Sequence, residues 1–159
     1  AAKSDNVESK MLEATLEVNE LQPQIIVQMA EERLGVLKGK KIAVLGLAFK
    51  PDTDDVRESR SEIVVKELMD KGAEVVGHDP EAMDNFKELI EVNTAPSVEE
   101  TLEKADCVIL MTEWKEYTEI SLKMLRNRMS GNVIIDGRRA FNPAQIEAAG
   151  FDYRAIGLG

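Results

Sequence analysis

Two basic residues and one aromatic residue stand on a single loop that follows an apolar segment of the sequence. The segment covers residues 41–47, and the loop after it carries Phe49, Lys50 and Arg57. Fixed cations at the carboxyl end of a buried strand suit an anionic ligand such as a phosphate, and the phenyl ring supplies an apolar wall. The loop also holds three aspartates, so a second interpretation stays open, in which the cations only neutralise these carboxylates.

Two further loops place polar side chains after apolar segments. Thr112 and Trp114 follow the segment that begins at Cys107, and Arg138 follows the segment that begins at Val133. Arginine suits phosphate because its planar group donates to two oxygens at once. Thr112 and Trp114 are also consistent with a local role in turn formation and packing. The sequence therefore adds Arg138 to the candidate anion site.

Three reactive side chains give weaker signals. Asp79 follows the second apolar segment, where it either binds a ribose hydroxyl or caps a helix. His78 is the only histidine and has no sequence neighbours arranged as a triad or metal site, so we expect a strand-end residue. Cys107 lies inside an apolar run, where we predict a buried structural thiol and not a nucleophile. No catalytic residue and no metal site is predicted.

Short apolar runs alternate with helical patterns after Gly39, which is typical of βαβ units. The expected strands are 42–47, 74–77, 107–111, 133–136 and 153–156, with a weaker one near Val92. The expected helices are 58–71, 81–90, 97–104, 120–128 and 143–149. Strands that are apolar throughout must be covered on both faces. We expect an α/β fold, a Rossmann-like doubly wound parallel sheet of about five or six strands. The loop at 46–59 lacks Gly-x-Gly-x-x-Gly, so it is not the usual dinucleotide cradle.

The chain starts with a helical arm, expected over 7–34, in which apolar residues recur at three- and four-residue steps. These residues are Met11, Ala14, Val18, Leu21, Ile25 and Met29. Pro23 falls inside the pattern and should kink the helix or split it, because it removes one backbone hydrogen bond. Three partners stay open for the stripe: this chain's own domain, a second copy in a dimer, or an upstream domain. We expect the arm to cover 1–37 and one domain to cover 38–159.

Length and composition set broad limits. The 159 residues, 43% hydrophobic and 31% charged, suit one globular domain with a buried core. The net charge of −10 argues against nucleic acid or an anionic membrane as a partner. The single cysteine and the lack of a run of roughly 20 apolar residues indicate a cytoplasmic protein without an internal disulfide or a membrane span. Because the chain starts Ala-Ala-Lys and not with Met, we expect it to be part of a longer protein.

The run VLGLAFKPDTDDVRES at 44–59 is the longest of several motifs that resemble one enzyme family. With Asp79-Pro80, Thr112-Glu-Trp114 and Asp136-Gly-Arg138, it resembles the C-terminal domain of the UDP-glucose/GDP-mannose dehydrogenase family. The resemblance spans 38–159. The arm resembles the end of the family's central helix, which links two α/β domains and carries the dimer interface.

The resemblance implies an activity and a set of site residues. Family members oxidise the C6 alcohol of a nucleotide sugar in two NAD-dependent steps, through intermediates bound to a cysteine. Their C-terminal domain supplies much of the nucleotide-sugar site, whereas NAD sits mainly on the N-terminal domain. By resemblance, Phe49 and Lys50 contact the substrate, Arg138 contacts the nucleotide sugar, and Arg57 reaches across to NAD. Arg139 stands where many bacterial members have asparagine, so it is left out of the site.

Other family features have no counterpart in this sequence. Neither the cysteine motif that supplies the nucleophile nor the glycine-rich N-terminal domain is present, so we expect a C-terminal part that does not oxidise alone. The Asp-Gly-Arg loop is more similar to that of UDP-glucose members than to that of GDP-mannose or UDP-N-acetylmannosamine members. The expected partners are a UDP-sugar and a second copy bound through the arm. Two alternatives stay open: a free-standing nucleotide-sugar-binding module without chemistry, and an assembly domain whose loop cations are only ion-paired.

Overall fold

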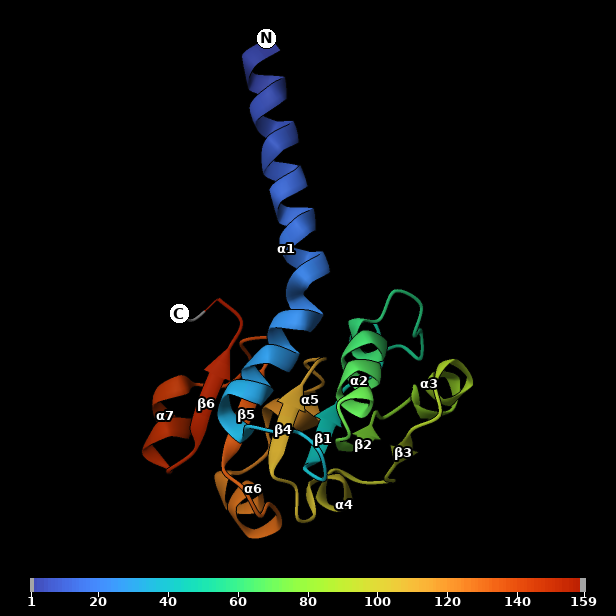
Figure 1. Cartoon of the computed structure of the whole chain (residues 1–159), viewed down its shortest axis with the longest axis vertical. Coiled ribbons are helices and arrows are strands. Elements are labelled where there is room, and N and C mark those ends of the chain that lie inside the picture. The colour runs from blue at the N-terminus through green and yellow to red at the C-terminus, as the bar shows by residue number, and fades with distance from the viewer. Residues whose placement is uncertain (1, 158–159) are drawn as a thin grey trace.

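A long helix leads into a parallel sheet that is covered by helices (Figure 1). The computed structural model describes residues 2–157, and it describes the side chains of 7–13 and 20–157. The strands are β1 (Lys41–Leu45), β2 (Glu74–His78), β3 (Asn93–Thr94), β4 (Cys107–Leu110), β5 (Val133–Asp136) and β6 (Asp152–Ala155). The helices are α1 (Ala2–Leu34), α2 (Arg60–Asp70), α3 (Met83–Leu89), α4 (Val98–Leu102), α5 (Lys115–Thr118), α6 (Leu122–Arg128) and α7 (Pro143–Ala148).

The six strands lie in the order β3-β2-β1-β4-β5-β6, and every neighbouring pair is parallel. The chain moves outward from β1 in one direction and then returns to start again at β4. The point between β1 and β4 is therefore where strand order reverses, and ligands of such sheets bind beyond the carboxyl ends of the strands there. The predicted Rossmann-like parallel sheet is confirmed.

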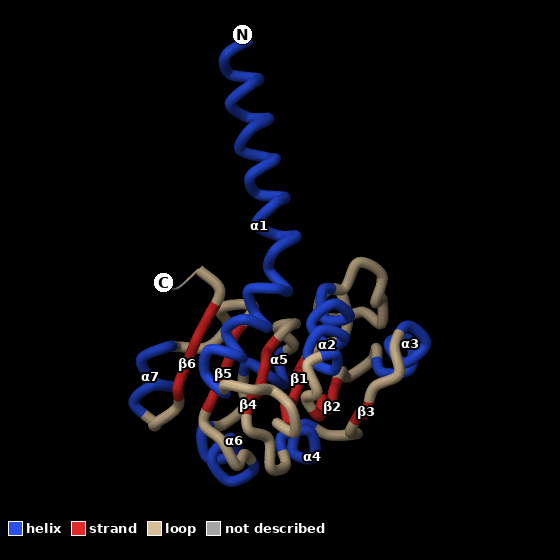
Figure 2. The backbone as a smooth tube through the Cα atoms, viewed as in Figure 1, coloured by secondary structure: helices blue, strands red, loops and turns tan. Residues whose placement is uncertain are grey.

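Side chains of β1, β4 and β5 alternate between two apolar layers. Ile42 and Val44 pack with residues of α1, α2 and α3, whereas Ala43 and Leu45 pack with residues of α4, α5, α6 and α7. Figure 2 shows the strands enclosed by these helices. Since both faces are covered, every residue of β4 and β5 is buried, as the unbroken apolar runs predicted.

The predicted elements are present with small shifts at their ends. The expected helix 58–71 starts later, at Arg60, because Ser59 is its N-cap: the Ser59 hydroxyl accepts a hydrogen bond from the amide of Ser61. Glu58 has a φ of 59°, which is not helical. Helix α5 was not predicted, because its 4 residues are too few to give a periodic pattern.

Helix α1 runs without interruption through Pro23, so of the two predicted outcomes, a kink or a split, the split is wrong. Pro23 is buried where the helix reaches the body of the domain, and that packing holds the chain in a helix despite the lost hydrogen bond. Figure 1 shows the N-terminal part of α1 projecting away from the sheet.

The apolar stripe of α1 does not pack on this chain along its whole length. Met11 is 66% exposed and Leu21 is 55% exposed, whereas Ile26, Val27 and Ala30 are buried against the sheet. The interpretation that the stripe packs on its own domain is therefore wrong for Met11 and Leu21, although Met29 does pack against the core. The side chains of Ala14 and Val18 lie outside the described residues. The helix has apolar residues on adjacent faces, and the sequence alone did not indicate which face docks.

Candidate functional site

A cleft lies beyond the carboxyl ends of β1, β4 and β5, at the point where strand order reverses. Segments far apart in the sequence line it, namely Gln22, Ala48, Phe49, 58–61, Met111, Gly137 and Arg138. The structure thus brings together Phe49 and Arg138, which were predicted from separate loops. A larger groove, between α2, α3 and the first residues of β2, contains none of the predicted site residues.

The loop after β1 presents Phe49 and Lys50 differently. Phe49 is 50% exposed and lines the cleft, and its amide donates to the carbonyl of Asp55 at 2.8 Å, which closes the loop. Lys50 is exposed one residue further along, and it is not among the residues that line the cleft. An apolar wall is therefore in place, while the charge of Lys50 acts on Asp55 of the same loop and lowers its pKa.

Arg57 is held on the outside of the same loop by Asp55. Its Nε and Nη2 atoms donate to Oδ1 and Oδ2 of Asp55, each at 3.0 Å, and its side chain is 87% exposed. Hydrogen bonds from the Arg57 side chain and amide lower the pKa of Asp55 to about 2. In this conformation Arg57 neutralises an aspartate, as one of the two interpretations predicted, and it does not line the cleft.

Arg138 forms a two-pronged ion pair with Glu113, which lies on the loop after β4. Its Nη2 donates to Oε1 of Glu113 at 3.0 Å, and its Nε donates to Oε2. The hydrogen bonds from Arg138 lower the pKa of Glu113. We did not predict this contact. The parallel pairing of β4 and β5 brings their carboxyl ends side by side, so an acidic residue in the Thr112-Glu-Trp motif was the available signal.

The buried carboxylate of Asp136, the last residue of β5, shapes the loop that bears Arg138. Its Oδ1 accepts from the amide of Arg138, and its Oδ2 accepts from the amide of Phe141 and the hydroxyl of Tyr153. Gly137 approaches its surroundings closely, because a Cβ there would lie 2.9 Å from the carbonyl oxygen of Leu110. The Asp-Gly-Arg spacing therefore sets where Arg138 leaves the sheet.

Several strained or closely packed residues hold the loop after β1. Gly46 has a φ of 102°, and a Cβ there would lie 2.5 Å from the Cβ of Thr112. Thr112 is buried and donates to the carbonyl of Ala48 at 2.9 Å, so it has the packing role that was one of its two predicted roles. Asp52 and Glu58 both have positive φ values, 63° and 59°. Such conformations persist only where the surrounding structure imposes them.

Comparison with known proteins now identifies the family. Residues 43–143 match the UDP-binding domain of the UDP-glucose/GDP-mannose dehydrogenase family. This chain belongs to that family. The matched span contains Phe49, Lys50, Arg57 and Arg138.

Relatives with this UDP-binding domain are longer proteins. The UDP-glucose 6-dehydrogenase AglM of Haloferax volcanii is 37% identical over 157 residues, which make up 98% of this chain and 35% of that protein. A solved UDP-glucose dehydrogenase from Pyrobaculum islandicum has a TM-score of 0.73 and 39% identity, over 87% of this chain and 31% of that one. An NDP-N-acetyl-D-galactosaminuronic acid dehydrogenase from Methanosarcina mazei has a TM-score of 0.78 and 31% identity, over 89% and 30%. The chain thus spans about a third of the length of these relatives.

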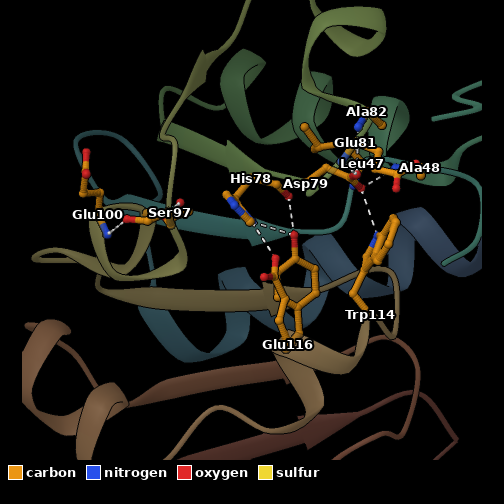
Figure 3. A network of polar contacts seen from close by, with 12 residues as sticks. Leu47, Ala48, His78, Asp79, Glu81, Ala82, Ser97, Glu100, Trp114 and Glu116 are labelled. Atoms are coloured by element: carbon orange, nitrogen blue, oxygen red, sulfur yellow. Dashed lines mark hydrogen bonds and ion pairs between the residues drawn. The ribbon is translucent and has the colours of Figure 1, made fainter. Parts of the chain in front are cut away.

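Asp79 of this UDP-binding domain is fully buried and caps the turn before α3 (Figure 3). Its Oδ1 accepts from the amides of Glu81 and Ala82 at 3.0 and 2.9 Å. The ribose role does not fit, because a carboxylate without exposed surface cannot meet a ribose hydroxyl. The capping role holds for the turn and not for the helix itself, since the N-cap residue of α3 is Ala82, which has no side-chain cap hydrogen bond. Trp114 is also buried, and its indole nitrogen donates to Oδ2 of Asp79.

His78 and Cys107 have structural surroundings, as predicted. His78 ends β2 and is buried; its Nδ1 lies 2.7 Å from the hydroxyl of Tyr117, which donates to the carbonyl of His78. Burial lowers the pKa of His78. Cys107 is fully buried in β4, and desolvation raises the pKa of its thiol, which disfavours a nucleophilic thiolate.

Two kinds of site are absent from the described residues of this family member. That part of the chain contains no group of three or more His, Cys, Asp or Glu side chains arranged to hold a metal ion. Within residues 2–157, none of the helices combines the length and hydropathy that a bilayer-spanning segment requires.

Proposed function

We propose that this chain is the C-terminal, nucleotide-sugar-binding domain of an NAD-dependent UDP-glucose 6-dehydrogenase, which oxidises UDP-glucose to UDP-glucuronate. The observation that carries the proposal is the cleft between Phe49 and Arg138 at the strand reversal, and both residues lie inside the span matched by the UDP-binding domain. The names of the relatives from Haloferax volcanii and Pyrobaculum islandicum support UDP-glucose as the substrate.

The chain's own residues have binding roles in this proposal. The guanidinium of Arg138 and the ammonium of Lys50 hold the diphosphate, because both donate charge-assisted hydrogen bonds to phosphate oxygens. Phe49 packs against an apolar part of the nucleotide sugar. NAD accepts hydride when it is bound to the rest of the enzyme, and we assign Arg57 to reach toward it. Since Arg57 is paired with Asp55, this role requires the exposed pair to separate.

The proposed organisation has an arm at 1–37 and a binding domain at 38–159. Exposed apolar side chains line the projecting part of α1, namely Val7, Met11, Leu12 and Leu21. We assign them to a homodimer interface, since water-exposed apolar side chains on a helix face favour burial against a partner. Leu21→Asp should lower the dimer fraction in light scattering. An unchanged mass at equal concentration would remove the dimer from the proposal.

The nucleophile and most of the NAD site belong to the rest of the enzyme in this proposal, so the chain alone should not oxidise the sugar. We keep the cytoplasmic setting within the proposal, with the free thiol of Cys107 in its support. A second candidate is a nucleotide-sugar-binding module without chemistry, for which the same cleft would suffice. A third is a GDP-mannose or UDP-N-acetylmannosamine dehydrogenase, which differs only in the ligand that the cleft selects.

Calorimetric titration of UDP, UDP-glucose and GDP-mannose into this chain tests the proposal. We expect the two UDP ligands to bind, and Lys50→Ala and Arg138→Ala each to weaken binding by about 1.5 to 3 kcal/mol. Arg128→Ala is the matched control, because Arg128 is also paired with a glutamate and is 48% exposed, but lies outside the cleft. Equal binding by the Arg138→Ala and Arg128→Ala variants would refute the site. Preferential binding of GDP-mannose would favour the third candidate.

A further inference from the structure

One buried carboxylate joins the carboxyl ends of three strands, β1, β2 and β4, and two of them, β1 and β4, border the cleft. The side chain of Asp79 is 0% exposed and accepts five hydrogen bonds from groups on three segments. Figure 3 shows it between the loop after β1 and the side chain of Trp114. A buried charge is stable only when donors surround it, so this set of contacts must be kept together.

The first contact is with the backbone that leads into the cleft. The amides of Leu47 and Ala48 donate to the same oxygen, Oδ2 of Asp79, at 2.8 and 2.9 Å. Both residues are buried, so neither amide can turn to water instead. Phe49 and Lys50 follow directly in the chain. The direction in which these two residues leave the sheet therefore depends on Asp79.

The second contact reaches the loop that carries the partner of Arg138. The indole nitrogen of Trp114 donates to Oδ2 of Asp79 at 3.2 Å, and Trp114 is only 7% exposed. Glu113, which precedes Trp114, is the residue that pairs with Arg138. One carboxylate oxygen thus links the Phe49 loop to the Glu113 loop.

The third contact fixes the carboxylate itself. The amides of Glu81 and Ala82 donate to Oδ1, so the turn before α3 sets the orientation of the Asp79 side chain. In dinucleotide-binding sheets an acid at the end of β2 binds a ribose from outside. Here the acid at this place is directed inward, and five protein donors occupy its oxygens.

We propose that Asp79 is a positioning residue of the nucleotide-sugar site: it holds Leu47 and Ala48 so that Phe49 lines the cleft, with Lys50 next in the chain, and it joins this loop through Trp114 to the loop that carries Glu113. This inference rests on the proposed function. Asp79 does not touch the ligand.

The variant Asp79→Asn tests the role. Asparagine has the same shape, but one of its two oxygens is replaced by an amino group that donates. Because asparagine is a good N-cap, its oxygen should stay with Glu81 and Ala82, and its amino group would then face the donors of Leu47, Ala48 and Trp114. Asp79→Asn should therefore keep the hydrogen bonds from Glu81 and Ala82 and lose those that hold Leu47 and Ala48 in the loop after β1.

Three measured properties should change in Asp79→Asn: amide exchange, tryptophan emission and UDP affinity. Hydrogen exchange at the Leu47 and Ala48 amides should become faster, and the emission of Trp114, the single tryptophan of the chain, should shift. The affinity for UDP should fall by about tenfold, which corresponds to the loss of one hydrogen bond to a charged group. A purely structural role elsewhere in the sheet would not move these three readouts together.

Asp106→Asn is the matched control. The carboxylate of Asp106 also accepts from a loop-side backbone amide, that of Lys41 at 2.8 Å, but at the opposite ends of the strands. This variant should lose stability while it keeps the Trp114 emission and the UDP affinity of the unchanged chain.

The outcomes separate the inference from the proposed function. If the unchanged chain does not bind UDP, the proposed site fails, while exchange and emission still decide whether Asp79 holds the loop. Normal exchange at Leu47 and Ala48 in Asp79→Asn, or UDP affinity within about twofold of the unchanged chain, would overturn the inference. Should Asp79→Asn not fold, Trp114→Phe takes its place: it removes one donor to Oδ2 of Asp79, so the inference expects faster exchange at the Leu47 and Ala48 amides and weaker UDP binding. Unchanged exchange and binding would contradict it.

Discussion

Arg138 and Glu113, on neighbouring strand ends, form two hydrogen bonds between guanidinium and carboxylate. The side chains are 40% and 36% exposed, so water screens the pair in part. The cation assigned to the ligand phosphate is thus already occupied in this conformation. A phosphate must displace Glu113 or share the guanidinium with it, and the ion pair competes with the ligand.

Glu113→Gln should therefore strengthen UDP binding. The neutral amide competes less well for Arg138 and does not repel a phosphate, but exposed ion pairs contribute only about 0.2 to 1 kcal/mol. We expect a two- to fivefold lower Kd, or about that free energy, in calorimetric titration. Glu103→Gln is the control, because Glu103 pairs with Arg128 away from the cleft. Weaker binding by Glu113→Gln would mean that Glu113 orients Arg138 for the ligand and does not compete with it.

The ion pair between Asp55 and Arg57 should depend on pH. The pKa of Asp55 is about 2, lower than its usual 3.8, mainly through the side-chain hydrogen bonds from Arg57. A depressed pKa means that the pair supports the loop above the unfolded value and is lost as the pH falls through about 2. Protonation of Asp55 should hence not break the pair near neutral pH, and its separation there requires a competing ligand.

Replacement of Arg57 tests whether this residue causes the low pKa of Asp55. In Arg57→Gln, a carboxyl NMR titration should give Asp55 a pKa that has moved back toward 3.8. Lys50→Gln should move it less, because the charge of Lys50 is the smallest of the effects on Asp55. An unchanged pKa in Arg57→Gln would mean that the ion pair does not persist in solution.

Much of this fold was predictable because its signals are local. Short unbroken apolar runs such as 107–110 are typical of strands buried on both faces, and their alternation with helical patterns predicts the parallel sheet. The end of α2 nearest the site was less predictable. Ser59 caps the helix while Glu58 takes a left-handed conformation, and both depend on contacts with the loop after β1.

The candidate site was predictable in its residue types and not in its pairings. Phe49 and Arg138 could be placed together because the carboxyl ends of parallel strands meet at one edge. That Glu113 occupies Arg138 depends on the register of β4 against β5, which no local pattern contains. The docking face of α1 was missed for a similar reason, since apolar residues lie on more than one of its faces.

Gly46 should tolerate alanine worse than other glycines of similar backbone shape. Its φ is 102°, and a Cβ would lie 2.5 Å from atoms of Thr112. Gly150 has a φ of 94° with nothing within 4 Å, so Gly150→Ala measures the conformational cost alone, about 1 to 2 kcal/mol. Gly46→Ala should add about 1 to 3 kcal/mol for the collision, as measured by urea unfolding. Equal losses for the two variants would show that Thr112 moves aside freely.

Cys107 should be inert in the folded protein and replaceable without loss of binding. Its side chain is fully buried in β4, and burial raises the pKa of the thiol, so little reactive thiolate forms. A thiol reagent should label Cys107 only after the chain unfolds in denaturant. Cys107→Ser should lower the free energy of unfolding by about 1 to 3 kcal/mol, because it buries a hydroxyl in an apolar layer. Cys107→Ala, which introduces no hydroxyl, is the control, and both variants should keep the UDP affinity of the unchanged chain. Rapid labelling of the folded protein, or a loss of UDP binding in a folded Cys107→Ala variant, would contradict the structural role and place this thiol in the site.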